Sequence, residues 1–528
     1  MRTIKLRIIG AAILLLSMTG CSDWNDHYEN IGVTGSDATI WEEIASNPQL
    51  SDFAEVLQHT TFFRQHKKTD ASYAEILNGG QSFTVVAPVN GTFNKDSLIA
   101  LTQTAIGDSA VEHLFVKNHI SRSPHSAIES TFRMLNNKKV TICADNISGI
   151  GILESNIHTK NGILHIISSE MPYNYTIFER LTMFPEFSSL GKILSAYNEF
   201  EFDEDASVSS GMIDGVPVYV DSVLYERNRL LEKVGLLNAE DSSYYAAVPT
   251  LAGWDTIWNR TTPYYNYHNA MEKRDSLQAY WTTRALIEDA IFSRTIQSDE
   301  QKEIRSVQYD PKEPLYHIFY RPFDADGLLG SASSTISCSN GTIFTYPEWP
   351  FTPSQTFFKK IEQEGEQESH IISYDKCTYN TRSLNADSIS DGGYIEITPS
   401  TGTANWTITY KLANTLAGKY DFCVITLPKT IEDPTVKVRP YRFKATINYI
   451  DQDGNPAKYD CEGKTFNSDA SLVDTIVVAE AFQLPTCNFD QTNDKFSITL
   501  QCNITAKENT KYDRKMYLDC ILLRPREN

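Results

Sequence analysis

The fold of this chain is decided by the stretch Phe83-Thr84-Val85-Val86-Ala87-Pro88-Val89-Asn90-Gly91-Thr92-Phe93. Its first half is a short apolar run that ends at a proline. Many buried strands end this way, because proline has no N–H to donate to a neighbouring strand. The pair Asn90-Gly91 predicts a tight turn or the cap of a helix. The stretch therefore predicts a buried strand that leads into a turn.

The chain repeats this arrangement. Tyr245 to Trp254 again places an apolar strand, a proline and an aromatic residue in the same order. A second paired element follows each copy, Asn161-Gly162-Ile163-Leu164-His165-Ile166-Ile167 in the first and Asn340-Gly341-Thr342-Ile343-Phe344-Thr345-Tyr346 in the second. An Asn-Gly pair before such a run is typical of a turn that enters a strand. Two copies of one domain are therefore predicted.

The paired stretches resemble the two signature motifs of fasciclin (FAS1) domains. The residues that match are Thr84, Val85, Ala87, Pro88, Asn90, Phe93, His119, Asn161, Gly162 and His165 in the first copy, and Pro249, Thr250, Trp254, Asn340 and Gly341 in the second. The resemblance implies structural roles for these residues. It also implies two tandem FAS1-like domains, at residues 37–172 and 173–355, of which the second is more divergent.

The two histidines of the first copy could be metal ligands or bases. His119 and His165 have no acidic residue or cysteine at a ligand spacing. They are therefore interpreted as packed, hydrogen-bonded residues of the domain.

The last part of the chain has a different pattern. The expected strands are Gly393–Ile397, Trp406–Leu412, Tyr420–Leu427, Tyr441–Ile450, Phe496–Ile504 and Met516–Leu523. They are short, alternate in polarity and have no helical period between them, which predicts an antiparallel sandwich or jelly roll at residues 371–528. The polar, acidic residues 356–370 are the expected linker. The whole chain is thus α+β: two tandem FAS1-like domains followed by an all-β, jelly-roll-like sandwich. The segment Tyr517–Leu523 resembles the last strand of carbohydrate-binding jelly rolls.

The N-terminus has the pattern of a secretory signal. Basic residues precede the apolar run Ile8–Leu16, and small residues lead to Cys21. This ending resembles a bacterial lipobox, which implies cleavage after residue 20 and a lipid on Cys21. A plain signal peptide with a coincidental cysteine is the alternative. Residues 21–36 would be a tether, and the acidic residue after Cys21 resembles the surface-export signals of Bacteroidetes lipoproteins. We therefore expect a lipid-anchored protein of the outer membrane that faces the cell exterior.

Composition excludes one class of partner and gives little support to cofactors. The net charge of the 528-residue chain is -20, so the basic footprint that nucleic acid requires is missing. Six of the nine cysteines lie in the last module, and buried free thiols are favoured over disulfides there because three of them fall inside expected strands. The stretch Asp451–Asn455 is interpreted as a hairpin turn, not a calcium loop, because its glycine is misplaced. The stretch Glu199–Asp205 is interpreted as a solvated acidic loop. No cofactor or metal is expected.

The second copy carries surplus residues within 259–308 that the domain does not need. Their rings offer a flat apolar face and a polar edge, which suits a sugar. The candidate ligand-binding residues are Tyr264, Tyr265, Tyr267 and Trp281. Packing of the insertion on its own domain is the alternative.

The leading hypothesis is a non-enzymatic cell-surface lipoprotein that binds glycan or another surface partner. The architecture resembles accessory proteins of outer-membrane nutrient uptake in Bacteroidetes, and the resemblance to FAS1 domains implies an adhesion module. The first alternative is protein–protein adhesion without glycan. The second is a hydrolase with its site in the C-terminal sandwich.

Overall fold

The computed structural model describes residues 36–64, 67–213, 216–294, 302–307, 318–384, 386 and 388–527. The chain divides into two compact units. The first comprises the chain up to residue 175 together with residues 202–225, and the second comprises residues 176–201 and everything from residue 226 onward. The signal peptide, Cys21 and almost all of the expected tether lie outside the described residues.

The first unit is built around a seven-stranded sheet in the order β4-β3-β9-β8-β7-β6-β5. The strands are β3 (Phe83–Pro88), β4 (Ile120–Arg122), β5 (Ser130–Arg133), β6 (Lys139–Ile142), β7 (Asn146–Ile147), β8 (Ile150–Thr159) and β9 (Gly162–Ile167). The predicted strand at the deciding stretch is confirmed: β3 is buried along its whole length. It lies parallel to β9, with Phe83 opposite Gly162 and Pro88 opposite Ile167.

Helices cover this sheet. They are α3 (Ile40–Ser46), α4 (Ser51–His59), α5 (Tyr73–Leu77), α6 (Lys95–Leu101) and α7 (Ala105–Leu114), and a hairpin of β1 (Thr61–Arg64) and β2 (Lys67–Ser72) lies beside them. Thr39 begins α3 with a capping box, in which its hydroxyl accepts from the Glu42 N–H while the Glu42 carboxylate accepts from the Thr39 N–H at 2.7 Å. Ile40 and Ile44 on α3 and Phe53 on α4 are fully buried in the core.

The second unit contains a helix–sheet domain that we call the middle domain, residues 176–201 and 226–352. Its sheet has the order β13-β12-β17-β16. The strands are β12 (Tyr244–Pro249), β13 (Ile291–Ser293), β16 (Ser334–Cys338) and β17 (Gly341–Tyr346). The central pair β12 and β17 is parallel, with Tyr244 opposite Gly341 and Pro249 opposite Tyr346. This is the pairing that β3 and β9 make in the first unit.

The paired asparagines make the same bonds in both domains. Asn161 accepts from the Ile40 N–H at 2.8 Å. It donates to the carbonyl of Leu77, the last residue of α5, and to that of Gly79. Asn340 accepts from the Ile177 N–H at 2.8 Å and donates to the Leu237 and Ala239 carbonyls. Each asparagine thereby ties the first helix of its domain to the strand that it precedes.

The glycine after each asparagine is required by close backbone packing. A Cβ on Gly162 would lie 1.9 Å from the Phe83 carbonyl oxygen, and one on Gly341 would lie 2.0 Å from that of Tyr244. Both glycines also have a φ near +150°, which other residues rarely adopt. The Asn-Gly pairs are therefore structural in both copies.

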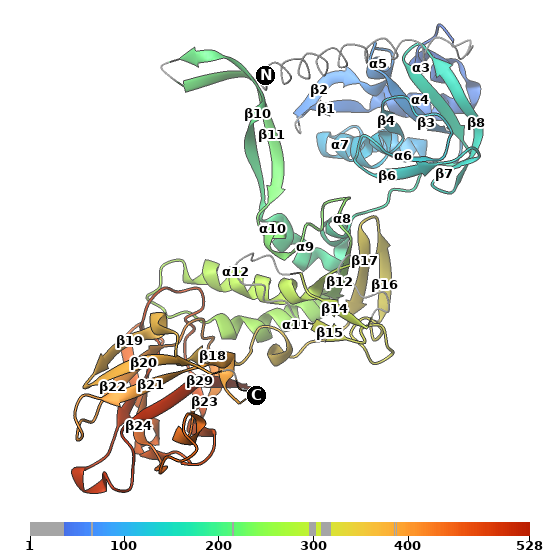
Figure 1. Cartoon of the computed structure of the whole chain (residues 1–528). Coiled ribbons are helices and arrows are strands. Elements are labelled where there is room, and N and C mark those ends of the chain that lie inside the picture. The colour runs from blue at the N-terminus through green and yellow to red at the C-terminus, as the bar shows by residue number, and fades with distance from the viewer. Residues whose placement is uncertain are drawn as a thin grey trace, which may run out of the picture. The chain divides into compact units, whose positions relative to one another are not determined.

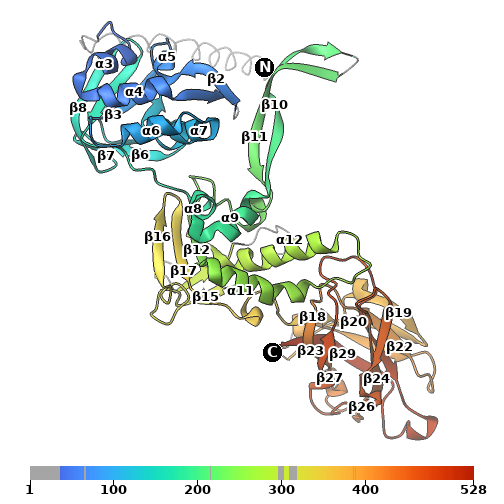
Figure 2. The same cartoon turned by 180° about the vertical axis from the view of Figure 1, so that it is seen from behind.

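The remaining middle-domain elements are α8 (Ile177–Met183), α9 (Ser188–Ser195), α10 (Leu231–Val234), α11 (Leu251–Thr261), the short helix η4 (Thr262–Tyr265), α12 (Arg274–Ile287), β14 (Glu303–Arg305) and β15 (Ile318–Tyr320). Figures 1 and 2 show α11 and α12 lying side by side, with the sandwich near one end of the pair.

The acidic stretch in the second copy is not a loop. Glu199 to Asp205 belong to β10 (Asn198–Ile213), which pairs with β11 (Val216–Asn228) in a two-stranded hairpin. The prediction of a solvated loop for this stretch rested only on the charges of its side chains. Phe200 and Phe202 alternate with the acids, and an alternation of period two is typical of a strand.

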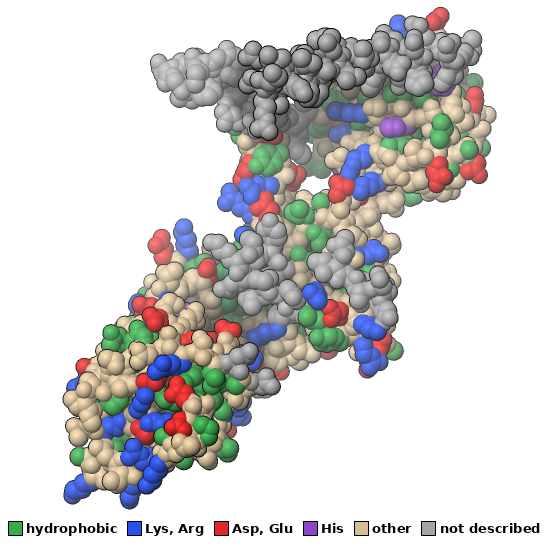
Figure 3. Space-filling view, in the orientation of Figure 1, with side chains coloured by type: hydrophobic (Ala, Val, Ile, Leu, Met, Phe, Trp, Pro, Cys, Tyr) green, Lys and Arg blue, Asp and Glu red, His purple; other side chains and the backbone are tan. Residues whose placement is uncertain are grey.

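The C-terminal part is a sandwich of two six-stranded sheets. One has the order β20-β21-β29-β23-β27 with β18 also paired to β29, and the other has the order β19-β22-β28-β24-β25 with β26 also paired to β24. Its strands are β18 (Ile361–Glu364), β19 (Ile371–Asp375), β20 (Cys377–Ser383), β21 (Gly393–Pro399), β22 (Thr407–Lys411), β23 (Gly418–Thr426), β24 (Arg442–Ile450), β25 (Pro456–Asp460), β26 (Phe466–Asn467), β27 (Asp474–Leu484), β28 (Ser497–Cys502) and β29 (Met516–Arg526). The six expected strands are confirmed, and the pairs between them are antiparallel. In Figure 3 the face of the sandwich toward the viewer intersperses acidic with basic side chains.

The expected linker is wrong. Phe358 is fully buried in the sandwich core, and β18 pairs with β29 from Ile361 opposite Leu523 to Glu364 opposite Cys520. The sandwich therefore begins before Ile371. The segment was expected to be a linker because of its charges, but a strand that covers a sheet edge buries few of its own side chains. In β18 only Gln363 is buried.

Candidate functional site

A pocket that combines aromatic and charged side chains lies in the second unit, where the middle domain meets the sandwich. Its volume is about 440 Å³, within the range of roughly 300–1,000 Å³ that is typical of small-molecule sites. The described residues that line it are Tyr265, Trp281, Arg284, Ala285, Glu288, Asp289, Ser306, Thr356, Phe357, Lys359, Lys360, Ile361, Asn414, Leu416, Tyr420, Phe489 and Asp490. We call this the interdomain pocket.

The chain between α11 and α12 brings the walls of the pocket together. Three backbone hydrogen bonds of 2.8 Å join this segment to sandwich loops, namely Ala417 N–H to the Tyr264 carbonyl, Cys487 N–H to the Asn266 carbonyl and Asn269 N–H to the Gln452 carbonyl. The Asn266 amide also donates to the Pro485 carbonyl at 2.8 Å. The surplus residues of the second copy therefore dock the middle domain on the sandwich.

Aromatic rings form one wall of the pocket. Trp281 and Phe489 meet edge to face with 4.8 Å between ring centroids, and Tyr265 meets Phe489 in the same way at 5.6 Å. The indole N–H of Trp281 is buried, and no described group accepts its hydrogen bond. A buried donor without an acceptor costs about 1–3 kcal/mol of stability.

Charged groups line the rest of the pocket, and we call them the charged wall. Arg284 is paired with Glu288, and its guanidinium carbon lies 4.7 Å from the Trp281 ring centroid. Burial lowers the pKa of Lys359, while the nearby Asp289 carboxylate acts against that shift. Burial raises the pKa of Asp490, and Arg284 acts against that shift. Each acid of this wall thus has a basic neighbour.

The four candidate ligand-binding residues are divided by the structure. Tyr265 and Trp281 line the interdomain pocket, whereas Tyr264 and Tyr267 lie outside it. Tyr264 packs on Phe358 with 4.7 Å between ring centroids. Tyr267 is fully buried and donates to the Phe489 carbonyl at 3.0 Å, which contradicts its predicted ligand contact. Sandwich loops cover it, and no feature of the local sequence predicts that cover.

The other pocket residues were not predicted. Arg284, Lys359 and Asp490 come from α12, the segment before β18 and a loop before β28. Their spacing in the sequence carries no motif, because the pairing is made only by the docking of two domains. The aromatic content of the 259–308 insertion was the one available signal.

The side chains of the two motif histidines, His119 and His165, form hydrogen bonds with backbone groups. His119 lies 2.8 Å from the Phe115 carbonyl through Nδ1 and accepts from the Met171 N–H at 3.0 Å through Nε2, so the ring is neutral. Burial lowers the pKa of His119 to about 4. His165 lies 2.9 Å from the His125 carbonyl through Nε2. Both rings pack as structural residues.

The other motif residues also lie in packed positions. The Thr84 hydroxyl donates to the Ser123 carbonyl at 2.8 Å, and Asn90 accepts from the Asp52 N–H at 2.9 Å at the start of α4. Phe93 packs on Phe115 with 5.0 Å between centroids. Ala87, Pro88 and Pro249 are buried in their strands, and the Thr250 N–H donates to the Tyr346 carbonyl at 2.8 Å.

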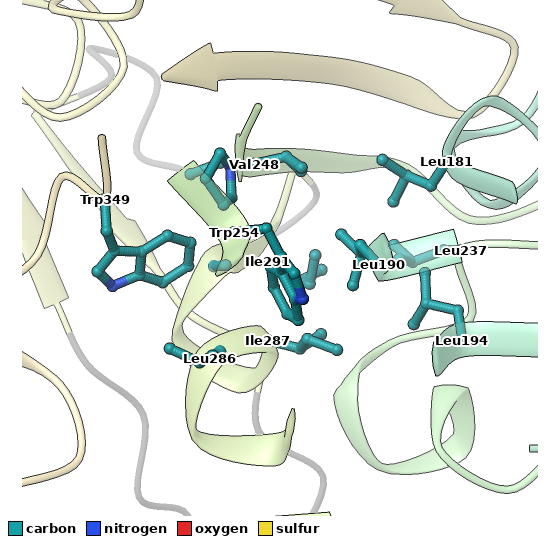
Figure 4. A pocket seen from close by; sticks show the side chains of 13 residues that line it. Leu181, Leu190, Leu194, Leu237, Val248, Trp254, Leu286, Ile287, Ile291 and Trp349 are labelled. Atoms are coloured by element: carbon teal, nitrogen blue, oxygen red, sulfur yellow. The ribbon is translucent and has the colours of Figure 1, made fainter. Parts of the chain in front are cut away.

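Trp254 lies in the core of the middle domain. Figure 4 shows its ring between Leu190 on one side and Trp349 on the other. The cavity beside it has a volume of about 10 Å³, which is room for one water molecule at most. This aromatic position of the motif is therefore filled by packing.

Two further sequence predictions can be compared with the structure. All eight cysteines in the described part of the chain are free thiols. Asp451 accepts from the backbone N–H groups of Asp453 at 3.0 Å and Asn455 at 2.8 Å, which is the hairpin turn between β24 and β25. Within the described ranges no group of three or more His, Cys, Asp or Glu side chains is arranged to hold a metal ion.

An acidic cluster lies inside the sandwich. Asp519 on β29 is 2% exposed, and the Ser390 N–H donates to it at 3.1 Å. Burial, with Glu364 and Glu366 nearby, raises the pKa of Asp519 to about 7. At this exposure a substrate does not reach the carboxyl group, so the cluster affects stability.

Comparison with known proteins assigns one part of the chain. Residues 49–171 match the family model of the fasciclin domain, so the first unit contains a fasciclin domain. No curated protein matches the sequence significantly. Among the described residues, no helix combines the length and the apolar character needed to cross a membrane.

Three solved structures align with parts of the chain. The FAS1 domain pair of the insect cell adhesion molecule Fasciclin I is 11% identical, with 52% of this chain and 90% of that chain covered and a TM-score of 0.19. The GH26-CBM35 β-(1,4)-mannanase of Podospora anserina is 14% identical, with 32% and 28% covered and a TM-score of 0.20. The family 35 carbohydrate-binding module of Clostridium thermocellum is 13% identical, with 31% and 97% covered and a TM-score of 0.17. The chain thus spans about a quarter of the mannanase's length.

Proposed function

We propose that this protein binds glycan at the interdomain pocket and acts by binding, not by catalysis. The observation that carries the proposal is the composition of the pocket. Rings of Trp281 and Phe489, which are half-buried, offer apolar faces for the C–H face of a sugar, and the charged wall offers donors and acceptors for its hydroxyl groups.

The architecture that we propose is a pair of fasciclin-type domains followed by the sandwich. The first domain rests on the family match at residues 49–171. For the middle domain, the support is the shared parallel strand pair and the equivalent bonds of Asn161 and Asn340.

The location that we propose is the outer face of the outer membrane, with a lipid on Cys21 as the anchor. This part of the proposal rests on the signal and lipobox pattern of residues 1–21. A glycan-binding lipoprotein at that place would be accessory to the uptake of glycan across the outer membrane.

A glycan array on the mature protein, followed by calorimetry of the best ligand, tests the proposal. Trp281→Ala should weaken that ligand by about 1–3 kcal/mol, as expected for the loss of a buried aromatic anchor. Trp258→Ala is the matched control, because Trp258 is half-buried in the same domain and lies outside the pocket. An array without any glycan bound would contradict glycan binding and leave adhesion to a protein as the better hypothesis.

Turnover of the bound glycan separates binding from hydrolysis. We expect the ligand to be recovered intact after prolonged incubation with the protein. Release of new reducing ends would contradict the binding function and favour the hydrolase alternative.

A further inference from the structure

We propose that the interdomain pocket selects neutral glycans over anionic ones. The proposal rests on the proposed glycan-binding function and adds the class of sugar. It follows from the way in which charge is balanced in the pocket lining.

The described lining carries as many basic as acidic side chains. The basic ones are Arg284, Lys359 and Lys360, and the acidic ones are Glu288, Asp289 and Asp490. The charges are also matched locally. Arg284 pairs with Glu288, Lys360 lies 2.7 Å from Glu362 at the rim, and Asp289 is the acid that acts on Lys359. The described lining therefore carries no net charge that would favour a charged ligand.

A carboxylate or sulfate of the sugar that binds Arg284 or Lys360 would have to separate that side chain from Glu288 or Glu362. The released acid would then lie beside the new anion in a partly buried site, and such unpaired or like charges cost several kcal/mol. A hydroxyl group does not require this separation. It donates to a carboxylate and accepts from a guanidinium or ammonium group at once, so it bridges an existing pair.

The apolar wall adds to the same preference. Trp281, Phe489 and Phe357 bury the C–H face of a sugar ring, and burial of an ionised group against these rings is unfavourable. Discrimination here depends on the penalty for the wrong ligand as much as on contacts with the right one.

Matched pairs of oligosaccharides test the inference. Each neutral glycan is compared by calorimetry with the same glycan oxidised at C6 to the uronate, on the full mature chain. We expect the uronate to bind at least about tenfold more weakly. Equal or tighter binding of the uronate would overturn the inference but leave the proposed function standing. Failure of all glycans to bind would overturn both.

A charge variant provides the second test. Asp490→Asn removes one acid beside Arg284. The ratio of the affinity for the neutral glycan to the affinity for the uronate should therefore fall by about tenfold. Asp494→Asn is the matched control, because Asp494 is exposed, pairs with Lys411 and lies outside the pocket lining. An Asp490→Asn protein that folds, binds the neutral glycan and keeps the wild-type ratio would contradict the inference.

Discussion

At the scale of single residues, His119 couples the stability of the fasciclin domain to pH. The ring is buried and neutral, with a pKa of about 4 against an ordinary value of 6.5. A lowered pKa of a base means that the unfolded chain takes up the proton more readily. The stabilisation is therefore complete above pH 6.5 and is lost as the pH falls toward 4, by up to about 3 kcal/mol.

Thermal unfolding of the full chain between pH 7.5 and 4.5 measures this effect. His119→Gln should flatten the pH dependence of the fasciclin-domain transition, because glutamine does not titrate. His59→Gln is the control, since His59 is exposed on α4. An unchanged slope in the His119 variant would show that other groups cause the dependence.

Asp519 changes the stability of the fold with pH in the opposite direction to His119. Its pKa is raised from 3.8 to about 7, so the folded state holds a proton that the unfolded state releases. The raised pKa of Asp519 therefore lowers the free energy of unfolding. This loss of stability is absent below pH 3.8, grows as the pH rises and is complete above pH 7. Asp519→Asn should therefore stabilise the sandwich at pH 8 by up to about 4 kcal/mol and should have little effect near pH 4.

Denaturant unfolding at the two pH values tests the Asp519 prediction. Asp375→Asn serves as the control, because Asp375 is exposed on β19. Destabilisation of the Asp519 variant at pH 8 would mean that the charged carboxylate is needed for its bond with Ser390.

At the scale of elements, β18 sets the boundary of the sandwich. A fragment that starts at Pro353 retains β18 and Phe358, whereas one that starts at Ile371 loses both. Removal of a buried phenylalanine alone costs about 3–5 kcal/mol. We expect the longer fragment to unfold cooperatively and at a clearly higher midpoint in urea. Equal midpoints would place the boundary at Ile371 after all.

The elements that could be predicted from the sequence are those whose own residues carry the pattern. β3 is buried throughout and its Pro88 marks its end, so periodicity and one proline were sufficient. β18 buries only Gln363 among four residues, so its pattern is that of a polar loop. The prediction of a loop at β10 was wrong because it rested on the acidic residues alone. The alternation of Phe200 and Phe202 with these acids is typical of a strand.

At the scale of the whole molecule, the candidate site could be predicted only in part. Tyr265 and Trp281 were identified because aromatic surplus is visible along the chain. Arg284 and Asp490 are some 200 positions apart, and they converge only because Tyr267 and its neighbours dock on the sandwich. Sequence spacing carries no information about such a docked interface.

The proposed lipid anchor also concerns the whole molecule. If Cys21 carries the lipid, Cys21→Ala should move the protein from the membrane fraction to the soluble one, because the lipid is the anchor that the sequence offers. The control is Cys143→Ala, which keeps residues 1–21 unchanged. Fractionation and immunoblotting measure the shift, and full retention of the Cys21 variant in the membrane would contradict the proposed anchor.

The parallel pairing of β3 and β9 determines how the fasciclin domain responds to mechanical force. Residues 36–38 are bonded beside the entrance of β9, at 2.9 Å from Ser36 N–H to the His158 carbonyl, while the chain leaves the domain beyond the opposite end of β9. Tension between residues 36 and 171 therefore pulls β9 along its own axis, between β3 and β8, and strains all of its hydrogen bonds together. Stretching from these two positions in an optical trap should give one abrupt rupture, and gradual peeling at low force would contradict this. If the protein is anchored at the cell surface as proposed, flow would pull this domain along its most resistant direction.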